Sequence, residues 1–202
     1  MNFLAHLVLS PGGEKIMAGN FFADRVRGSS WKSLEADYAQ GVLLHRRIDH
    51  FTDQHPIVRE AKQFIHPRFG LFRGVLLDVF WDHFLACDFD RHTGGLDLAE
   101  FAEYAHQTLA AHAPVFHPEA PRMIDAMVRG QWLVGYAEMD GVDRVLRQMS
   151  QRFPLQNPMG EGADALREAH GDLEPLFNTF WLDLVAEFGL NSRDSVHVGG
   201  KD

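Results

Sequence analysis

The feature that most constrains the fold is the segment VLLDVFWDHFLAC at residues 75–87, which is apolar except for Asp78, Asp82 and His83. A helix that is apolar on all sides is usually buried, so this segment predicts a central core helix. Asp78 and Asp82 are four residues apart and share one helical face, about 6 Å from each other. Two carboxylates in a dry setting need a cation, a shared proton or an arginine. The segment therefore predicts either a metal site or a structural salt bridge.

A second apolar segment, VLLHRRIDHFTD at residues 42–53, has the same character. Its His45 and Asp49 are at positions i and i+4, which places an imidazole and a carboxylate on one helical face. His6 lies within FLAHLVL, and Asp24 follows two phenylalanines and an alanine, so we expect both to point inward. Together these residues predict a metal site with both nitrogen and oxygen ligands. His83 could be a further ligand or could hydrogen-bond to one. The predicted metal ligands are His6, Asp24, His45, Asp49, Asp78 and Asp82.

This ligand set favours particular ions and a particular chemistry. Structural zinc sites usually recruit thiolates, whereas imidazole with several carboxylates suits Mn²⁺, Fe²⁺, Mg²⁺ or catalytic Zn²⁺. Such ions activate water against phosphate esters. We find no Gly-rich phosphate loop, no GxSxG and no HExxH motif, and we expect Cys87 to be a packed core residue rather than a nucleophile. The alternative is a non-enzymatic helical binding protein whose His/Asp pairs are internal salt bridges.

The chain predicts an all-α fold, because strict alternation of apolar and polar residues is nearly absent. Ser10-Pro11 and Ser33 resemble helix starts, and Asp97 with Glu100 resembles a capping box. We expect one compact multi-helix domain over residues 1–190 and a frayed C-terminal tail over 191–202. The predicted helices are 14–27, 34–53, 56–66, 71–89, 98–112, 119–134, 137–152 and 163–189, with a Pro/Gly loop at 154–162.

Composition limits the cellular setting and the partners. A single cysteine excludes a disulfide framework, and no apolar run is long enough to span a membrane, so we expect a cytoplasmic protein. A net charge of −9 disfavours nucleic-acid binding, which needs many phosphate contacts from Lys and Arg. Residues 1–75 nevertheless carry a small positive excess, which could meet an anionic ligand. The basic residues singled out for that contact are Arg25, Arg27, Arg46 and Arg47.

Five segments together resemble the acyl carrier protein phosphodiesterases, bacterial enzymes of the wider HD phosphohydrolase group. They are MNFLAHL (1–7), GNFFADRVRG (19–28), GVLLHRRIDHFTDQHP (41–56), LDVFWDHFL (77–85) and QWLVGYAEMDGV (131–142). The resemblance implies an HD-like helical fold and hydrolysis of the phosphodiester that links 4′-phosphopantetheine to a serine of holo acyl carrier protein. It also implies Mn²⁺ dependence, and Asp24 matches an aspartate regarded as essential in the family.

Residue pattern and resemblance agree on one hypothesis for the reaction. A divalent ion activates water, and Arg46 or Arg27 stabilises the charge that grows on the phosphoryl oxygens. His50 or His83 donates a proton to the serine leaving group. The basic residues 25, 27, 46 and 47 dock the acidic carrier protein. An HD-type nucleotide phosphohydrolase, acting on a nucleotide or a guanosine polyphosphate, remains the alternative enzyme, and the sequence indicates no oligomeric state.

Overall fold

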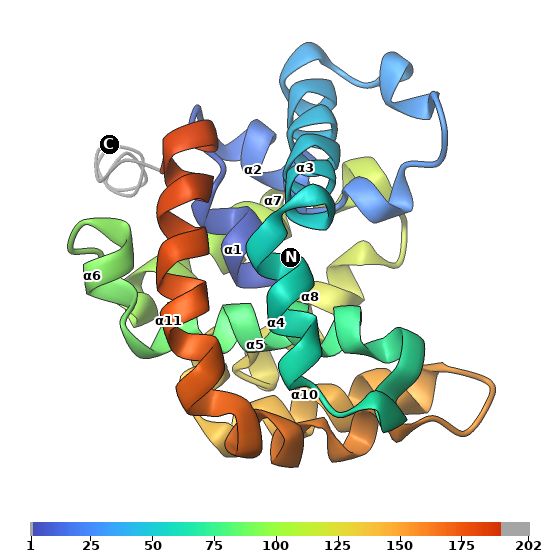
Figure 1. Cartoon of the computed structure of the whole chain (residues 1–202). Coiled ribbons are helices and arrows are strands. Elements are labelled where there is room, and N and C mark those ends of the chain that lie inside the picture. Colours follow the sequence, from blue (N-terminus) through green and yellow to red (C-terminus); the bar gives the residue numbers. More distant parts are fainter. Residues whose placement is uncertain (1, 191–202) are drawn as a thin grey trace.

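The computed structural model describes residues 2–190, and every regular element within that range is a helix (Figure 1). This confirms the predicted all-α class. The elements are α1 (Phe3–Val8), α2 (Glu14–Phe21), η1 (Ala23–Arg25), η2 (Ser30–Ser33), α3 (Ala36–Gln54), α4 (Pro56–Phe64), η3 (Pro67–Phe72), α5 (Arg73–Cys87), α6 (Phe89–Thr93), α7 (Leu98–Phe116), α8 (Ala120–Arg129), α9 (Trp132–Gly135), α10 (Met139–Arg152), η4 (Pro158–Glu161) and α11 (Gly162–Phe188).

Helix α5 runs through the middle of the bundle, as its apolar sequence predicts (Figure 1). Ten of its residues between Leu76 and Ala86 are buried, including Phe80 and Trp81. Helices α1, α4, α10 and α11 all pack against it. The short helix α1 is itself almost wholly buried, so the polar side chains that it carries are held inside the fold.

Helices α2 and α3 approach each other unusually closely, because glycines face each other at their crossing. A Cβ on Gly19 would collide with the carbonyl of Tyr38, and one on Gly41 would collide with the carbonyl of Ile16. Only glycine permits such an approach of two backbones. The contact sets Asn20 of α2, and His45 one turn beyond Gly41, on the side of α1.

Several helix ends follow the sequence prediction. α4 begins at Pro56 with His55 as its N-cap, whose Nδ1 accepts a hydrogen bond from the Ile57 amide. The Asp97 carboxylate accepts hydrogen bonds from the amides of Ala99 and Glu100 at the start of α7, which confirms the predicted cap. α7 then continues to Phe116, four residues beyond the predicted end.

Other expected boundaries were wrong. Ser10 does not cap α2, which starts at Glu14 after Gly13, because the Ser10 hydroxyl donates to the carbonyl of His6 instead. The helix predicted over 14–27 ends at Phe21. α3 starts at Ala36 after Glu35, since the Ser33 hydroxyl donates within η2.

The helix predicted over 119–134 is divided into α8 and α9. Gly130 ends α8, and Gln131 adopts a left-handed backbone conformation with φ of 48°. Likewise, the predicted 71–89 helix is divided at Asp88 between α5 and α6. Cys87, expected in the core, is exposed at the end of α5.

Within residues 2–190, no helix combines the length and apolarity needed to cross a membrane. The domain boundary at 190 stays a prediction, and the tail predicted over 191–202 lies outside the described residues.

Candidate metal centre

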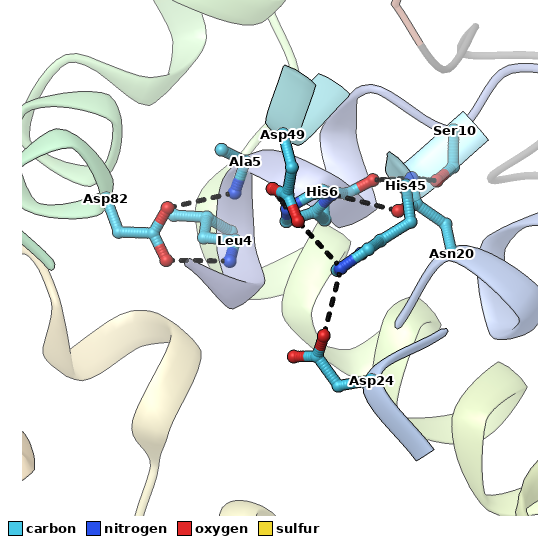
Figure 2. A network of polar contacts seen from close by, with 9 residues as sticks. All are labelled: Leu4, Ala5, His6, Ser10, Asn20, Asp24, His45, Asp49 and Asp82. Carbon is cyan, nitrogen blue, oxygen red and sulfur yellow. Dashed lines mark hydrogen bonds and ion pairs between the residues drawn. The ribbon is translucent and has the colours of Figure 1, made fainter. Parts of the chain in front are cut away.

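A cluster of two histidines and one aspartate joins α1 to α3 (Figure 2). His6 of α1 and His45 and Asp49 of α3 each offer a ligand atom, and these atoms all lie within 4.8 Å of one another. His6 Nε2 is 3.2 Å from Asp49 Oδ1, and His45 Nε2 is 3.1 Å from Asp49 Oδ2. The two imidazole rings stack with centroids 4.2 Å apart. One carboxylate thus faces two imidazole nitrogens.

Asp24 of η1 adds a second carboxylate on the solvent side of the cluster. Its Oδ1 lies 3.3 Å from His45 Nε2. The side chain of Asp24 is 87% exposed and that of Asp49 is 41% exposed, whereas those of His6 and His45 are 4% and 10% exposed. A cavity of about 50 Å³ borders His6, Asp24 and His45. The imidazoles therefore form the inner wall of the cluster, and the carboxylates form its open rim.

The donor set fits a divalent ion. His6 Nε2 and both ring nitrogens of His45 are buried and make no hydrogen bond of acceptable geometry, although carboxylate oxygens lie near the two Nε2 atoms. Ligands about 2.1 Å from an ion and at right angles to each other lie about 3 Å apart, close to the separations seen here. Imidazole with carboxylate suits Mn²⁺, Fe²⁺, Mg²⁺ or catalytic Zn²⁺. His6, His45, Asp49 and Asp24 are thus the residues that could hold a metal.

The electrostatics of the cluster are strongly perturbed. Burial lowers the pKa of His6 to about 4, so its ring is neutral at pH 7. Burial would also lower the pKa of His45, but the Asp24 and Asp49 carboxylates outweigh it and raise that pKa to about 9. Despite its own burial, Asp49 has a pKa held well below the usual range, chiefly by contact with the His45 imidazole. Contact with His45 also lowers the pKa of Asp24. Both carboxylates are therefore ionised at neutral pH.

The acidic pair of α5 lies in a different setting from this cluster. Asp82 is fully buried, and its two oxygens accept hydrogen bonds from the Leu4 and Ala5 amides at 2.8 and 3.0 Å (Figure 2). It therefore caps the start of α1, although burial raises its pKa to about 7. Burial also raises the pKa of Asp78. Among the described residues, the three-residue cluster includes neither Asp78 nor Asp82, so their predicted role as metal ligands stays a prediction.

The two histidines expected to donate a proton are placed differently from each other. His83 is buried, and its Nδ1 lies 2.7 Å from the backbone oxygen of Tyr136. Burial lowers the pKa of His83, so its ring is neutral and held by the backbone. His50 is exposed on α3, next in sequence to Asp49. His83 therefore lies outside the cluster, whereas His50 is exposed on α3, the helix that also carries His45 and Asp49.

The four basic residues singled out by sequence also differ in their contacts. Arg46 donates through Nη2 to the carbonyls of Val26 and Gly28, so it holds the loop that follows Asp24. Arg47 pairs with Glu187 of α11 at 3.3 Å and covers the ring of Phe188. The guanidinium of Arg25 lies 3.1 Å from the sulfur of Met123. Arg25 and Arg27 are both exposed on the segment that carries Asp24.

Sequence reasoning missed two buried polar residues beside the cluster, Ser10 and Asn20. Both have no exposed surface, and both hydrogen-bond to His6 (Figure 2). The sequence did contain a signal for Asn20, because this amide lies in an apolar stretch beside Gly19, the glycine at the crossing of α2 and α3. A buried amide needs hydrogen-bond partners, but nothing in the spacing identified which residue supplied them.

Comparisons with known proteins agree with the sequence resemblance. The family model described as acyl carrier protein phosphodiesterase matches residues 1–184. Relatives named acyl carrier protein phosphodiesterase, from Enterobacter sp. (strain 638) and Escherichia coli (strain K12 / DH10B), are each 36% identical over 185 residues. In both cases the match covers 90% of this chain and 92% of the relative. No solved structure matches the chain.

Proposed function

The chain belongs to the acyl carrier protein phosphodiesterase family, and we propose that it hydrolyses the phosphodiester between 4′-phosphopantetheine and a serine of holo acyl carrier protein. Water adds to phosphorus, the bond from phosphorus to the serine oxygen breaks, and that oxygen takes up a proton. The products are apo carrier protein, with its serine hydroxyl restored, and 4′-phosphopantetheine.

One observation supports the cluster of His6, His45 and Asp49 as the place where this reaction occurs. Two buried Nε2 atoms, of His6 and His45, face the two oxygens of one Asp49 carboxylate, and they do so at the exposed edge of the fold. An internal salt bridge would gain little from opening one side to water. A centre that takes in a phosphodiester needs that open side.

The proposed ligands are His6, His45, Asp49 and Asp24, and Mn²⁺ is the proposed ion. When bound, such an ion lowers the pKa of water and neutralises charge on phosphoryl oxygens. His6 and His45 exclude water from the inner wall, because both rings are buried. Asp49 faces both rings with its two oxygens, and Asp24 contributes negative charge at the rim.

Residues that do not ligate the proposed ion hold or assist the ones that do. Arg46 anchors the backbone at Val26 and Gly28, two and four residues beyond Asp24, so it restricts the movement of η1 relative to α3. His50 is the proposed proton donor for the leaving serine oxygen, because it is exposed on the same helix as His45 and Asp49. His83 has no part in this proposal, since its ring is held by the carbonyl of Tyr136.

The proposed docking site for the carrier protein is the segment around Asp24. Arg25 and Arg27 follow this aspartate by one and three residues and are exposed, so an acidic protein could approach them while its prosthetic group reaches the cluster. Electrostatic complementarity of this kind raises the association rate and weakens with salt.

The direct test is incubation of the purified chain with holo carrier protein and Mn²⁺, followed by intact-mass measurement of the carrier. We expect the carrier to lose its phosphopantetheine arm. EDTA should prevent this loss, and added Mn²⁺ should restore the hydrolysis. A panel of nucleotides and guanosine polyphosphates under the same conditions should stay intact. Hydrolysis of the panel with an untouched carrier protein would overturn the proposed substrate.

A further inference from the structure

A closed hydrogen-bond network surrounds His6 on the side away from the metal ligands (Figure 2). The Ser10 hydroxyl donates to the His6 backbone oxygen at 2.7 Å. The Asn20 amide nitrogen lies 2.8 Å from both the His6 backbone oxygen and the Ser10 hydroxyl. The Asn20 side-chain oxygen lies 2.9 Å from His6 Nδ1. All three residues are buried, so water does not substitute for these contacts.

The network determines which way the Asn20 amide points. The His6 backbone oxygen can only accept, so the Asn20 atom that faces it at 2.8 Å must be the NH₂ group. The Ser10 hydroxyl uses its proton on the same carbonyl and accepts from the other N–H of Asn20. The reverse amide orientation would place an oxygen against two acceptors. The Asn20 oxygen is therefore the atom that faces His6.

The orientation of Asn20 in turn determines the tautomer of His6. An amide oxygen cannot donate, so His6 Nδ1 must carry the proton in this contact. A neutral imidazole has one N–H, so the lone pair is left on Nε2. The nearest Asp49 carboxylate oxygen lies 3.2 Å from this nitrogen but outside hydrogen-bond geometry. A cation bound by both atoms would use the Nε2 lone pair, which accepts no hydrogen bond in the described part of the chain.

From this geometry we propose that Asn20 is a positioning residue that holds His6 as the Nδ1–H tautomer, so that Nε2 is ready to ligate a divalent cation before the cation arrives. Histidine ligands generally donate their other ring nitrogen to a partner of this kind, and loss of that partner typically costs 10–100-fold in metal affinity. Ser10 acts one step further out, because it accepts from Asn20 and thereby fixes the amide.

The inference rests on the proposed function only in taking His6 as a metal ligand. A purely structural role for Asn20 is the competing explanation, because its NH₂ group also satisfies a carbonyl near the end of α1. Two variants separate these roles. Asn20→Asp keeps an acceptor for His6 Nδ1 and loses the NH₂ group, whereas Asn20→Leu has a similar volume and loses both.

The experiment measures the tautomer and the metal affinity of the full chain without any carrier protein. Long-range ¹H–¹⁵N spectra of the metal-free, histidine-labelled protein at pH 7.5 distinguish protonated from unprotonated ring nitrogens. His83, whose Nδ1 contacts the carbonyl of Tyr136, serves as an internal reference for the Nδ1–H form. Mn²⁺ binding is followed separately by electron paramagnetic resonance of the free ion.

We expect His6 to be the Nδ1–H tautomer in the wild-type chain and in Asn20→Asp, with Mn²⁺ affinities within about threefold of each other. Asn20→Leu should lose the single tautomer and bind Mn²⁺ about 10–100-fold more weakly. A wild-type His6 protonated at Nε2 would overturn the inference, even if Asn20→Leu failed to fold. Equal loss of Mn²⁺ affinity in both variants would assign Asn20 a structural role alone. Intact Mn²⁺ binding with no carrier hydrolysis would refute the proposed function and leave this inference standing.

Discussion

The α1–α3 cluster and the acidic segment of α5 carry the same kinds of residue, yet the structure uses them differently. In the cluster, the ring nitrogens of His6 and His45 face the side-chain oxygens of Asp49 at an edge that is open to solvent. In α5, Asp82 and His83 face backbone groups inside the fold. The partner therefore decides the role. A carboxylate paired with backbone amides is already satisfied, while a carboxylate facing two imidazoles can still take a cation.

The largest difference between the two regions should appear with Asp49→Asn. The substitution removes the carboxylate that faces both Nε2 atoms, so we expect Mn²⁺ affinity and kcat/KM for holo carrier protein to fall by more than about 100-fold, beyond the range of a supporting residue. Asp53→Asn is the matched control, because Asp53 is exposed one turn later on α3. Unchanged Mn²⁺ affinity in Asp49→Asn would remove the cluster as a metal centre.

Asp82→Asn should produce the opposite pattern of effects. It replaces one acceptor with an NH₂ group against a buried backbone amide, so the start of α1 loses its cap. We expect the free energy of unfolding to fall by about 2–4 kcal/mol. The melting temperature should fall by about 2–4 °C for each kcal/mol in a chain of this size. Mn²⁺ affinity at a temperature where the variant is folded should stay near wild type, and a loss comparable to that of Asp49→Asn would erase the distinction.

The fold was largely predictable, because helical periodicity and capping residues are local properties. Asp97 and Pro56 each marked a helix start correctly. Ser10 and Ser33 were misleading, because a serine hydroxyl can donate to a nearby carbonyl as readily as it can cap a helix. Which of these a serine does depends on tertiary neighbours. The break at Gln131 depends on a backbone conformation that its side chain does not indicate.

The candidate site was predictable in part, because the i, i+4 pair of His45 and Asp49 is set by helix geometry alone. The addition of His6 required only that two apolar segments pack together. The α5 residues were included for the same reason, and here spacing was insufficient. Whether Asp82 meets an ion or the amides of α1 depends on which end of α1 faces α5. That orientation is set by long-range packing, so no local pattern encodes it.

The pH dependence of stability provides the next test of the comparison. In metal-free protein, the folded pKa of His45 is about 9, above its unfolded value of 6.5. Its contribution is therefore fully present below pH 6.5 and is lost as the pH rises through 9. The contribution is at most about 3 kcal/mol, and it is smaller in practice because Asp24 is exposed.

Chemical denaturation from pH 6 to 9.5 in the presence of chelator measures this contribution. The difference in unfolding free energy between wild type and His45→Gln should shrink across that range. The difference in unfolding free energy between wild type and Asp82→Asn should change at lower pH, between 3.8 and about 7. Burial raises the Asp82 pKa from 3.8 to about 7, so this is the range in which the folded and unfolded chains differ in protonation at Asp82. A difference between wild type and His45→Gln that does not vary with pH would contradict the ion-paired cluster.

We expect the smallest effect from charges at the rim of the cluster, beside Asp24. There a charge change should weaken binding of the carrier protein, whereas a similar change far from the cluster should not. Arg27→Glu reverses a charge three residues from Asp24, so we expect KM for holo carrier protein to rise about 3–10-fold with kcat nearly unchanged, since rim charges chiefly affect association. Arg144→Glu is the control, because Arg144 is exposed on α10, at the end of the bundle away from α3 (Figure 1). The wild-type KM should also rise with NaCl, and this rise should be weaker in Arg27→Glu. If the two variants had equal KM values, the carrier protein would be responding to net charge alone, and the open side of the cluster would lose its claim to be the docking face.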